Sequence, residues 1–213
     1  MSKIILSLVF LMSPLFAQVD TMIVQARQKI VKVISLNPFQ TSQGSGVYIA
    51  NGVILTENHV IGSNHDDVFV YDERWTDLKP AIVVYTDERL DFAVLSIKDK
   101  GNQQAIFSKD FRVGQAVFAT GNPLMGDFTF APAKIKGIYK IGGRSMIRVD
   151  SELIGPGFSG TPIFNDEGYV LGLLELCERG TEIGKTHACF AIPSTEIISK
   201  IRVMAVQSVK EIK

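Results

Sequence analysis

Short runs of β-branched and aromatic residues follow one another along most of this 213-residue chain, and each ends in a cluster of Gly, Pro, Asn or Asp. One such break, Asn51-Gly52, separates the runs GSGVYIA and VILTEN. An Asn-Gly pair between two apolar runs is a strong hairpin signal, because both residues tolerate positive φ. Short strands at these intervals, with no helical patterns between them, predict an all-β sandwich or barrel.

Helical patterns lie only near the two ends of the mature chain: VDTMIVQARQ at 19–28 could form a short helix, and the last stretch has helical periodicity. Ile197, Ile201 and Met204 recur at helical spacing behind Ser194, which predicts a C-terminal helix. The sequence DKGNQQ at 99–104 is the one weak candidate for a boundary between two β halves. We therefore expect one domain over residues 18–213, made of two halves.

Residues 1–17 have the pattern of a secretory signal peptide. Lys3 precedes a thirteen-residue, mostly apolar run, and Ala17 precedes the expected cleavage point. The alternative is a membrane anchor, but the run is shorter than the ~20 residues that a spanning helix needs. The pattern predicts export to a periplasm or out of the cell, with no membrane attachment after cleavage.

The charge balance narrows the class of partner. The chain has 22 basic and 22 acidic residues, so it carries no electrostatic footprint for nucleic acid or for an anionic membrane.

Cys177 and Cys189 flank the segment ERGTEIGKTHA, which has the composition of a hairpin loop. In an exported protein these two cysteines can form a disulfide, which would stabilise the folded protein by about 3 kcal/mol in the loop-entropy model. Two buried free thiols are the alternative.

Ser159 stands in the stretch GPGFSGTP, where the glycines and prolines indicate a turn but do not explain a hydroxyl. A serine hydroxyl becomes a nucleophile only when a base takes its proton and a third group orients that base. The oxyanion formed by its attack also needs N–H donors already in place. Gly157 allows the backbone to turn, so the N–H groups of Gly157 and Ser159 are the candidate oxyanion hole.

The chain has three histidines to supply the base. His59 follows the end of a predicted strand, His65 lies in a polar turn, and His187 begins a late strand. Asp91 leads directly into the apolar run FAVLSI, where a carboxylate needs donors such as an imidazole N–H. Taken singly, His59 could be a structural histidine and Asp91 a cap of local amides. The order His59, Asp91, Ser159 favours a catalytic triad.

Four segments together resemble the trypsin-like serine proteases, closest to the bacterial HtrA/Deg branch. They are GSGVYIANGVILTENHV, LDFAVLSI, TGNPLMG and RVDSELIGPGFSGTPIFNDEGYVLGL, and the resemblance runs from about residue 44 to FAIPS at 190–194. It implies two packed six-stranded antiparallel β-barrels with the active site between them. It also implies peptide-bond hydrolysis with His59 as base and then acid, Asp91 orienting it, Ser159 as nucleophile and Gly157 as an oxyanion donor.

That resemblance further implies protein or peptide substrates. The mechanism requires no metal or organic cofactor, and the sequence leaves the oligomeric state open. No PDZ module follows the protease segment, unlike most HtrA members. Phe158 precedes the serine, where the family more often has a small polar residue. Thr161 stands where the family more often has a second Gly, and both departures bear on the oxyanion loop.

Specificity is predicted from positions similar to the pocket walls of the family, namely Leu153, Ile154, Ala188 and Cys189. An apolar lining favours small or medium apolar side chains before the cut bond. Glu175, Glu178 and His187 lie near these positions and could instead recognise a charged side chain.

Two rival readings remain. An α/β-hydrolase is disfavoured, because Thr161 breaks the G-x-S-x-G motif and alternating helices are missing from the pattern. The other rival is a protease-fold protein that binds peptides or a partner without cleaving them.

Overall fold

The structure is a computed structural model, and it describes residues 20–37, 40–62, 67–99, 103–122, 128–178 and 187–211, with side chains described to 202. The predicted signal peptide, His65 and part of the 99–104 boundary lie outside these residues. No described helix is long and apolar enough to cross a membrane.

The N-terminal half is one antiparallel sheet preceded by a short helix over residues 20–27. Its hydrogen-bonded strand order is β5-β4-β1-β2-β3-β7-β6. The Asn-Gly break forms the predicted hairpin between β2 and β3, with Gly52 at φ 71°. The elements are β1 (Ile30–Asn37), β2 (Gln40–Ala50), β3 (Val53–Glu57), α2 (Asn58–Ile61), β4 (Asp67–Tyr71), β5 (Lys79–Pro80), β6 (Ile82–Asp87) and β7 (Phe92–Ser96).

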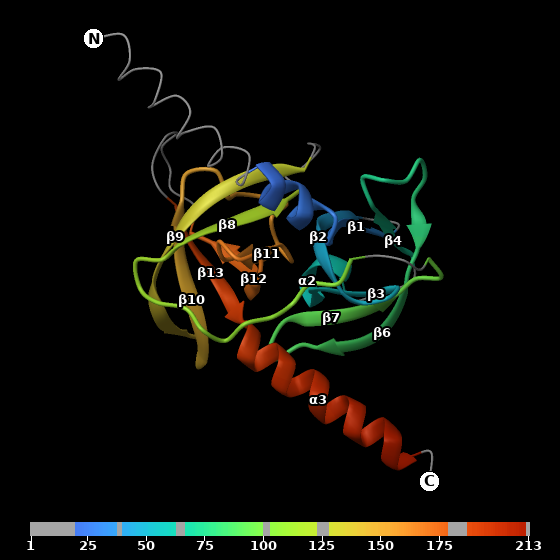
Figure 1. Cartoon of the computed structure of the whole chain (residues 1–213). Coiled ribbons are helices and arrows are strands. Elements are labelled where there is room, and N and C mark those ends of the chain that lie inside the picture. The colour runs from blue at the N-terminus through green and yellow to red at the C-terminus, as the bar shows by residue number, and fades with distance from the viewer. Residues whose placement is uncertain are drawn as a thin grey trace, which may run out of the picture.

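The C-terminal half is a closed barrel with the strand order β10-β13-β12-β11-β8-β9. A terminal helix, α3 (Ser194–Glu211), follows β13 directly and extends away from the two halves (Figure 1). The barrel strands are β8 (Ala116–Gly121), β9 (Thr129–Ile141), β10 (Arg144–Ser151), β11 (Pro162–Phe164), β12 (Val170–Cys177) and β13 (His187–Pro193).

The mostly-β architecture of two halves predicted from the sequence is confirmed, with one difference in detail. The N-terminal half has seven strands in an open, half-barrel sheet, whereas the C-terminal half alone is a closed six-stranded barrel. The sheet ends at β5, which has two residues, and at β6, where Ile82 is 68% exposed. Short or charged-flanked edge strands like these are how sheets commonly terminate.

One apolar cluster joins the two halves. Leu55 and Phe92 of the N-terminal sheet pack in the same buried group as Phe118 and Phe164 of the barrel. Ile197 of α3 is fully buried in it. The linker after β7 runs along both halves, since Ala105 N–H donates to the Tyr48 carbonyl at 2.8 Å and Ile106 accepts from Val170 at 2.8 Å. The halves therefore share a core.

Candidate active site

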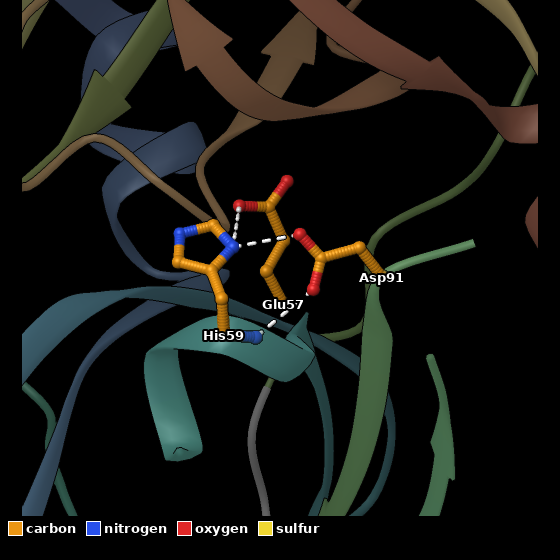
Figure 2. Close-up of side chains that lie close together, drawn as sticks. All are labelled: Glu57, His59 and Asp91. Atoms are coloured by element: carbon orange, nitrogen blue, oxygen red, sulfur yellow. Dashed lines mark hydrogen bonds and ion pairs between the residues drawn. The ribbon is translucent and has the colours of Figure 1, made fainter. Parts of the chain in front are cut away.

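His59 and Asp91 are brought together where β3 ends and β7 begins. The His59 ring Nδ1 lies 2.7 Å from Asp91 Oδ2, and the His59 backbone N–H donates to Asp91 Oδ1 at 2.9 Å (Figure 2). Asn58 N–H donates to the Asp91 carbonyl at 3.1 Å. Asp91 has φ 56°, a left-handed conformation that Asp tolerates better than most residues. The Asp91 carboxylate is thus hydrogen-bonded to both the ring and the backbone N–H of His59 in α2.

The orientation of the imidazole suits a base. The other ring nitrogen points away from both carboxyl groups in the close-up (Figure 2). The His59 side chain is 47% exposed and that of Asp91 is 20% exposed. When Nδ1–H donates to a carboxylate, Nε2 keeps a free lone pair. The nitrogen that points away from the carboxyl groups is therefore the one able to take a proton from a substrate or nucleophile.

Ser159 follows a tight turn over residues 155–158. Phe158 N–H donates to the Gly155 carbonyl at 3.1 Å, and Gly157 has φ 93°. Pro at the second position and a positive-φ glycine at the third are the features of a type II turn. A Cβ on Gly160, which has φ 80°, would lie 2.0 Å from the Ser45 carbonyl oxygen. Glycines 157 and 160 are thus required by the backbone path.

The serine turn is tied to the N-terminal half next to α2. Ser45 N–H donates to the Ser159 carbonyl at 2.7 Å, and Thr56 Oγ1 donates to the Ser45 carbonyl at 2.7 Å. A Cβ built on Gly44 would lie 2.6 Å from Val60 Cγ2 and 2.7 Å from the Ser159 carbonyl oxygen. Val60, the residue after His59, and the backbone of Ser159 therefore both pack against Gly44.

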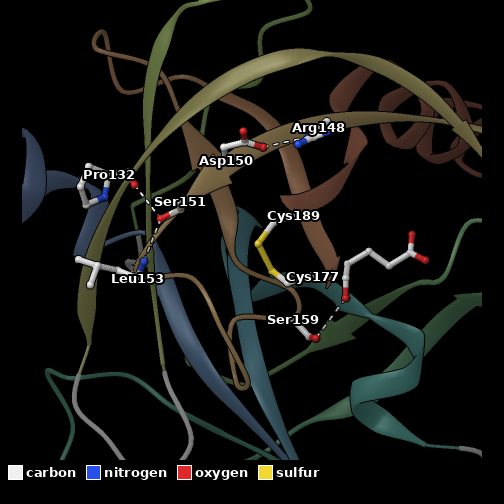
Figure 3. The surroundings of a disulfide bond; sticks show 9 residues. Pro132, Arg148, Asp150, Ser151, Leu153, Ser159, Cys177 and Cys189 are labelled. Atoms are coloured by element: carbon white, nitrogen blue, oxygen red, sulfur yellow. Dashed lines mark hydrogen bonds and ion pairs between the residues drawn. A yellow bond between two sulfur atoms is a disulfide. The ribbon is translucent and has the colours of Figure 1, made fainter. Parts of the chain in front are cut away.

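The Ser159 hydroxyl itself has a different partner from the predicted one. It donates to the Glu175 carbonyl at 3.3 Å (Figure 3). The hydrogen bond expected between Ser159 and His59 is not made among the described residues, although His59 and Asp91 are bonded as expected. Rotation about the Cα–Cβ bond of Ser159 changes which acceptor the hydroxyl reaches.

A cavity of about 350 Å³ opens beside Ser159. Of the residues proposed for the pocket wall, Ile154 lines this cavity, whereas Leu153 is 56% exposed and Cys189 is fully buried, and neither of these two is among the lining residues. Ala188 pairs with Asp150 in the barrel. Glu175, Glu178 and His187 all reach the cavity. The full lining is Ile154, Gly155, Pro156, Phe158, Ser159, Leu174, Glu175, Leu176, Cys177, Glu178 and His187.

The predicted disulfide is present. Cys177 and Cys189 are joined with an S–S distance of 2.06 Å, and they face one another in the register of β12 and β13 (Figure 3). Cys177 lines the cavity, so the bond holds one of its walls.

Glu57 is the residue of this site that the sequence analysis missed. Its side chain is fully buried, and its Oε2 lies 3.6 Å from His59 Nδ1. Within the described part of the chain, neither carboxyl oxygen has a hydrogen-bond partner. Burial, followed by the charges of Asp91 and Glu175, raises the pKa of Glu57 well above its usual value. A carboxylate closing the apolar strand VILTE, two residues before His59, was the available signal.

Glu57, His59 and Asp91 are also the described residues that could offer a metal three ligand atoms, all within 4.8 Å of one another. His59 Nδ1 and Asp91 Oδ2, however, are 2.7 Å apart. Two ligands of a tetrahedral zinc ion with bonds of about 2.0–2.1 Å lie farther apart than that. The arrangement fits a hydrogen-bonded pair.

Comparison with known proteins identifies the family. A family model described as a trypsin-like peptidase domain matches residues 44–173, which is more than half of the chain. The chain therefore belongs to the trypsin-like peptidases.

Within that family, its relatives are of the HtrA branch. Serine protease Do-like HtrA from Lactobacillus helveticus is 34% identical over 176 residues, covering 74% of this chain and 42% of that protein. A probable periplasmic serine endoprotease DegP-like from Pseudomonas savastanoi pv. phaseolicola is 39% identical over 143 residues, covering 62% of this chain and 28% of that one. The chain thus spans less than half the length of these curated relatives.

Solved structures agree on the fold. The active form of the Rv3671c protease from M. tuberculosis superposes with a TM-score of 0.74 at 25% identity, covering 85% of this chain and 82% of that one. The HtrA-type protease AlgW with a tripeptide has a TM-score of 0.77 at 24% identity, covering 85% and 61%. The second likeness is one of fold alone.

Proposed function

We propose that the chain is a serine endopeptidase that hydrolyses peptide bonds through an acyl-enzyme. His59 takes the proton of Ser159 Oγ, and that oxygen attacks the scissile carbonyl carbon. Asp91 keeps the ring in the tautomer that leaves Nε2 free and stabilises the imidazolium that forms. His59 then gives the proton to the leaving amine, and a water deprotonated by the same ring releases the acyl group.

The N–H groups of Gly157 and Ser159 are the proposed oxyanion hole. The positive φ of Gly157 supports this role, because a turn of this type exposes an N–H that other residues could not present. Among the described residues, neither N–H donates to a protein acceptor. Two such donors, fixed before the substrate arrives, can stabilise the charge that develops on the carbonyl oxygen.

The observation that carries the proposal is the His59–Asp91 pair beside the Ser159 turn. The Nδ1–Oδ2 distance of 2.7 Å fits a charge-assisted hydrogen bond. We propose that rotation about the Cα–Cβ bond turns the Ser159 hydroxyl from the Glu175 carbonyl toward His59. The Ser45 N–H donates to the Ser159 carbonyl at 2.7 Å, and this bond keeps the Ser159 backbone in place while the side chain rotates.

The test is covalent labelling by a fluorophosphonate probe, which reports a serine activated by its neighbours. We expect the wild-type protein to be labelled at Ser159 and Ser159→Ala to be unlabelled. Ser145→Ala is the matched control, since Ser145 bonds Lys140 on the barrel surface at 2.8 Å and should leave labelling unchanged. A wild-type protein that resists labelling would exclude the activated serine.

For the substrate, we propose small or medium apolar side chains before the cut bond. Ile154, Phe158 and Leu174 give the cavity an apolar lining. Glu178 and His187 are the polar groups that would instead favour a charged side chain. A peptide library cleaved by the same preparation decides, because a strict preference for Arg, Lys or Glu contradicts the apolar assignment.

We propose that the mature protein is exported, to a periplasm or out of the cell, after removal of residues 1–17. The cross-strand disulfide supports an oxidising compartment. Mass spectrometry of the mature N-terminus tests the cleavage: a chain that begins at Met1 or Ser2 contradicts it.

The alternative function is a protease-fold protein that binds a peptide or partner without cleaving it. The orientation of the Ser159 hydroxyl toward Glu175 is the observation that favours it. The same labelling separates the two, because a non-cleaving protein has no activated serine.

A further inference from the structure

Glu57 stands behind the His59–Asp91 pair, on the side opposite the proposed reaction. Its carboxyl group points at the ring nitrogen that faces Asp91 (Figure 2). Oε2 lies 3.6 Å from His59 Nδ1, whereas Asp91 Oδ2 lies at 2.7 Å. Nδ1 therefore has two carboxyl groups beside it, one bonded and one slightly beyond hydrogen-bond distance.

The position of Glu57 is costly for folding. Its side chain is 0% exposed, and neither oxygen has a hydrogen-bond partner among the residues that the structure describes. The Gly160 N–H faces the carboxyl group but donates to the Leu174 carbonyl at 2.8 Å. A buried carboxylate without donors costs several kcal/mol, so such groups usually ionise only when a cation approaches. Acidic groups kept under these conditions are candidates for a role at the site.

We propose that Glu57 is a positioning residue that acts on His59 as a second carboxyl partner, so that its charge changes the pH at which the His59 ring takes up a proton. The effect on hydrolysis rests on the proposed function, but the coupling between the two side chains does not.

The charged groups around Glu57 set the direction of the effect. Asp91 and Glu175 oppose its ionisation, and Arg144 favours it but is already paired with Glu175 at 2.5 Å. Among the described residues, His59 is the group facing Glu57 that can become a cation and lose that charge again as the pH changes. A proton on His59 therefore favours loss of the proton from Glu57, and an ionised Glu57 favours the imidazolium in return.

The effect of Glu57 on protonation of His59 can have only one direction. Ionised Glu57 stabilises the protonated ring, and neutral Glu57 leaves it unaffected, so the residue can only move protonation of His59 to higher pH than a neutral side chain would. The imidazolium formed when Ser159 gives up its proton gains the same support. Glu57 is thus expected to raise the basicity of His59 and, at the same time, to restrict activity at acid pH.

The experiment compares the full-length wild type with Glu57→Gln, which keeps the shape of the acid without its charge. The His59 ring is followed by NMR over a pH titration, and since the chain has three histidines, His59→Ala assigns its signal. We expect the midpoint of the His59 titration to fall by about 0.5–1 pH unit in Glu57→Gln, as for loss of a nearby opposite charge. Glu167→Gln, an exposed acid in the turn after β11, is the matched control and should leave the midpoint unchanged.

Hydrolysis gives a second readout. The acid limb of the kcat profile should move to lower pH in Glu57→Gln by the same amount, with the plateau lowered several-fold and KM unchanged. Glu57→Met, an apolar side chain of similar length, should show the same displacement. It keeps the test open if the Gln variant fails to fold, because both variants remove the charge.

These measurements distinguish failure of the Glu57–His59 coupling from failure of the proposed function. Titration curves for His59 that coincide in wild type, Glu57→Gln and Glu57→Met overturn the inference. A displaced His59 titration in a protein that no fluorophosphonate labels retains the coupling and overturns the proposed function. A lowered kcat without displacement of either curve also overturns the inference, since a purely structural role of Glu57 produces that result.

Discussion

The backbone N–H of Ser45 donates to the carbonyl oxygen of Ser159 at 2.7 Å, and this bond crosses from β2 to the turn before β11. It fixes the serine of the barrel against the half that carries His59 and Asp91. The Ser45 carbonyl in turn accepts from Thr56 Oγ1 at 2.7 Å, one residue before Glu57. A change near this contact is therefore expected to act on several parts of the site together.

Gly160→Ala tests that contact. A Cβ there would lie 2.0 Å from the Ser45 carbonyl oxygen, and the residue has φ 80°. Left-handed strain of about 1–2 kcal/mol adds to an overpacking cost of roughly 1–3 kcal/mol. We expect a lower thermal midpoint and at least a tenfold loss of fluorophosphonate labelling.

The matched control for that variant is Gly143→Ala. Gly143 has φ 79°, but a Cβ there meets nothing within 4 Å, so only the conformational strain remains. It should lose about 1–2 kcal/mol of stability and keep its labelling rate. Equal losses of stability in the two variants would mean that the Ser45 contact relaxes freely.

Asp91→Asn should lower turnover by about 10⁴, because the amide favours the wrong tautomer of His59. Asn keeps an oxygen for the His59 backbone N–H that now donates at 2.9 Å, so we expect little change in the thermal midpoint. Steady-state kinetics with a library-derived peptide and a melting curve measure the two effects. Turnover within a few-fold of wild type would show that Asp91 does not orient the base.

Ser159→Ala and His59→Ala should each lower kcat by roughly 10⁶. The two changes together should cost no more than either alone, because the residues act as a unit. Melting curves of the variants are expected to overlay that of the wild type within a few degrees. Additive losses in the double variant would indicate that the two side chains work independently.

Glu57 predicts a stability that depends on pH in a particular direction. Its pKa is raised in the folded protein above the ordinary value of 4.5, so the folded state binds this proton more tightly than the unfolded state. The free energy of unfolding contributed by Glu57 is therefore complete below about pH 4.5 and is lost as pH rises through the folded pKa. Glu57→Gln lacks this loss.

The measurement is the thermal midpoint of wild type and Glu57→Gln between pH 4 and 8. We expect the variant to gain on the wild type steadily as pH rises, with the smallest difference at pH 4. A difference that stays constant over this range, or that shrinks toward pH 8, would contradict the raised pKa of the buried Glu57.

The disulfide should matter for both stability and the cavity. Reduction, or Cys177→Ser with Cys189→Ser, should cost about 2–4 kcal/mol. Because Cys177 lines the cavity beside Ser159, we also expect KM to rise more than kcat falls. Melting and kinetics with and without reductant measure both, and a reduced protein with unchanged KM would separate the disulfide from the pocket.

The sequence predicted the parts of the site that depend on local patterns. Asn51-Gly52 marked a hairpin because few residues accept its φ, and Asp91 was found because a charge at the mouth of an apolar strand needs a donor. His59 was singled out by its place after that hairpin. Each of these inferences used residues within a few positions of one another.

What the sequence could not predict depends on contacts between distant segments. Glu57, at the end of β3, is fully buried and lies near enough to the barrel residues Gly160 and Glu175 for them to affect its pKa, a relationship that no local periodicity reports. The partner of the Ser159 hydroxyl is a carbonyl sixteen residues away, and its choice is a rotamer. The predicted pocket wall included Leu153, which is exposed, whereas Leu174 lines the cavity from the neighbouring strand.

The apolar cluster shared by the two halves has a consequence for how the protein unfolds. Because Leu55, Phe92, Phe118 and Phe164 belong to one buried group, neither half can open without uncovering the other. Melting should accordingly proceed as one all-or-none event. Heat or denaturant would then separate the proposed base, His59, from the proposed nucleophile, Ser159, in the same step that unfolds the two halves.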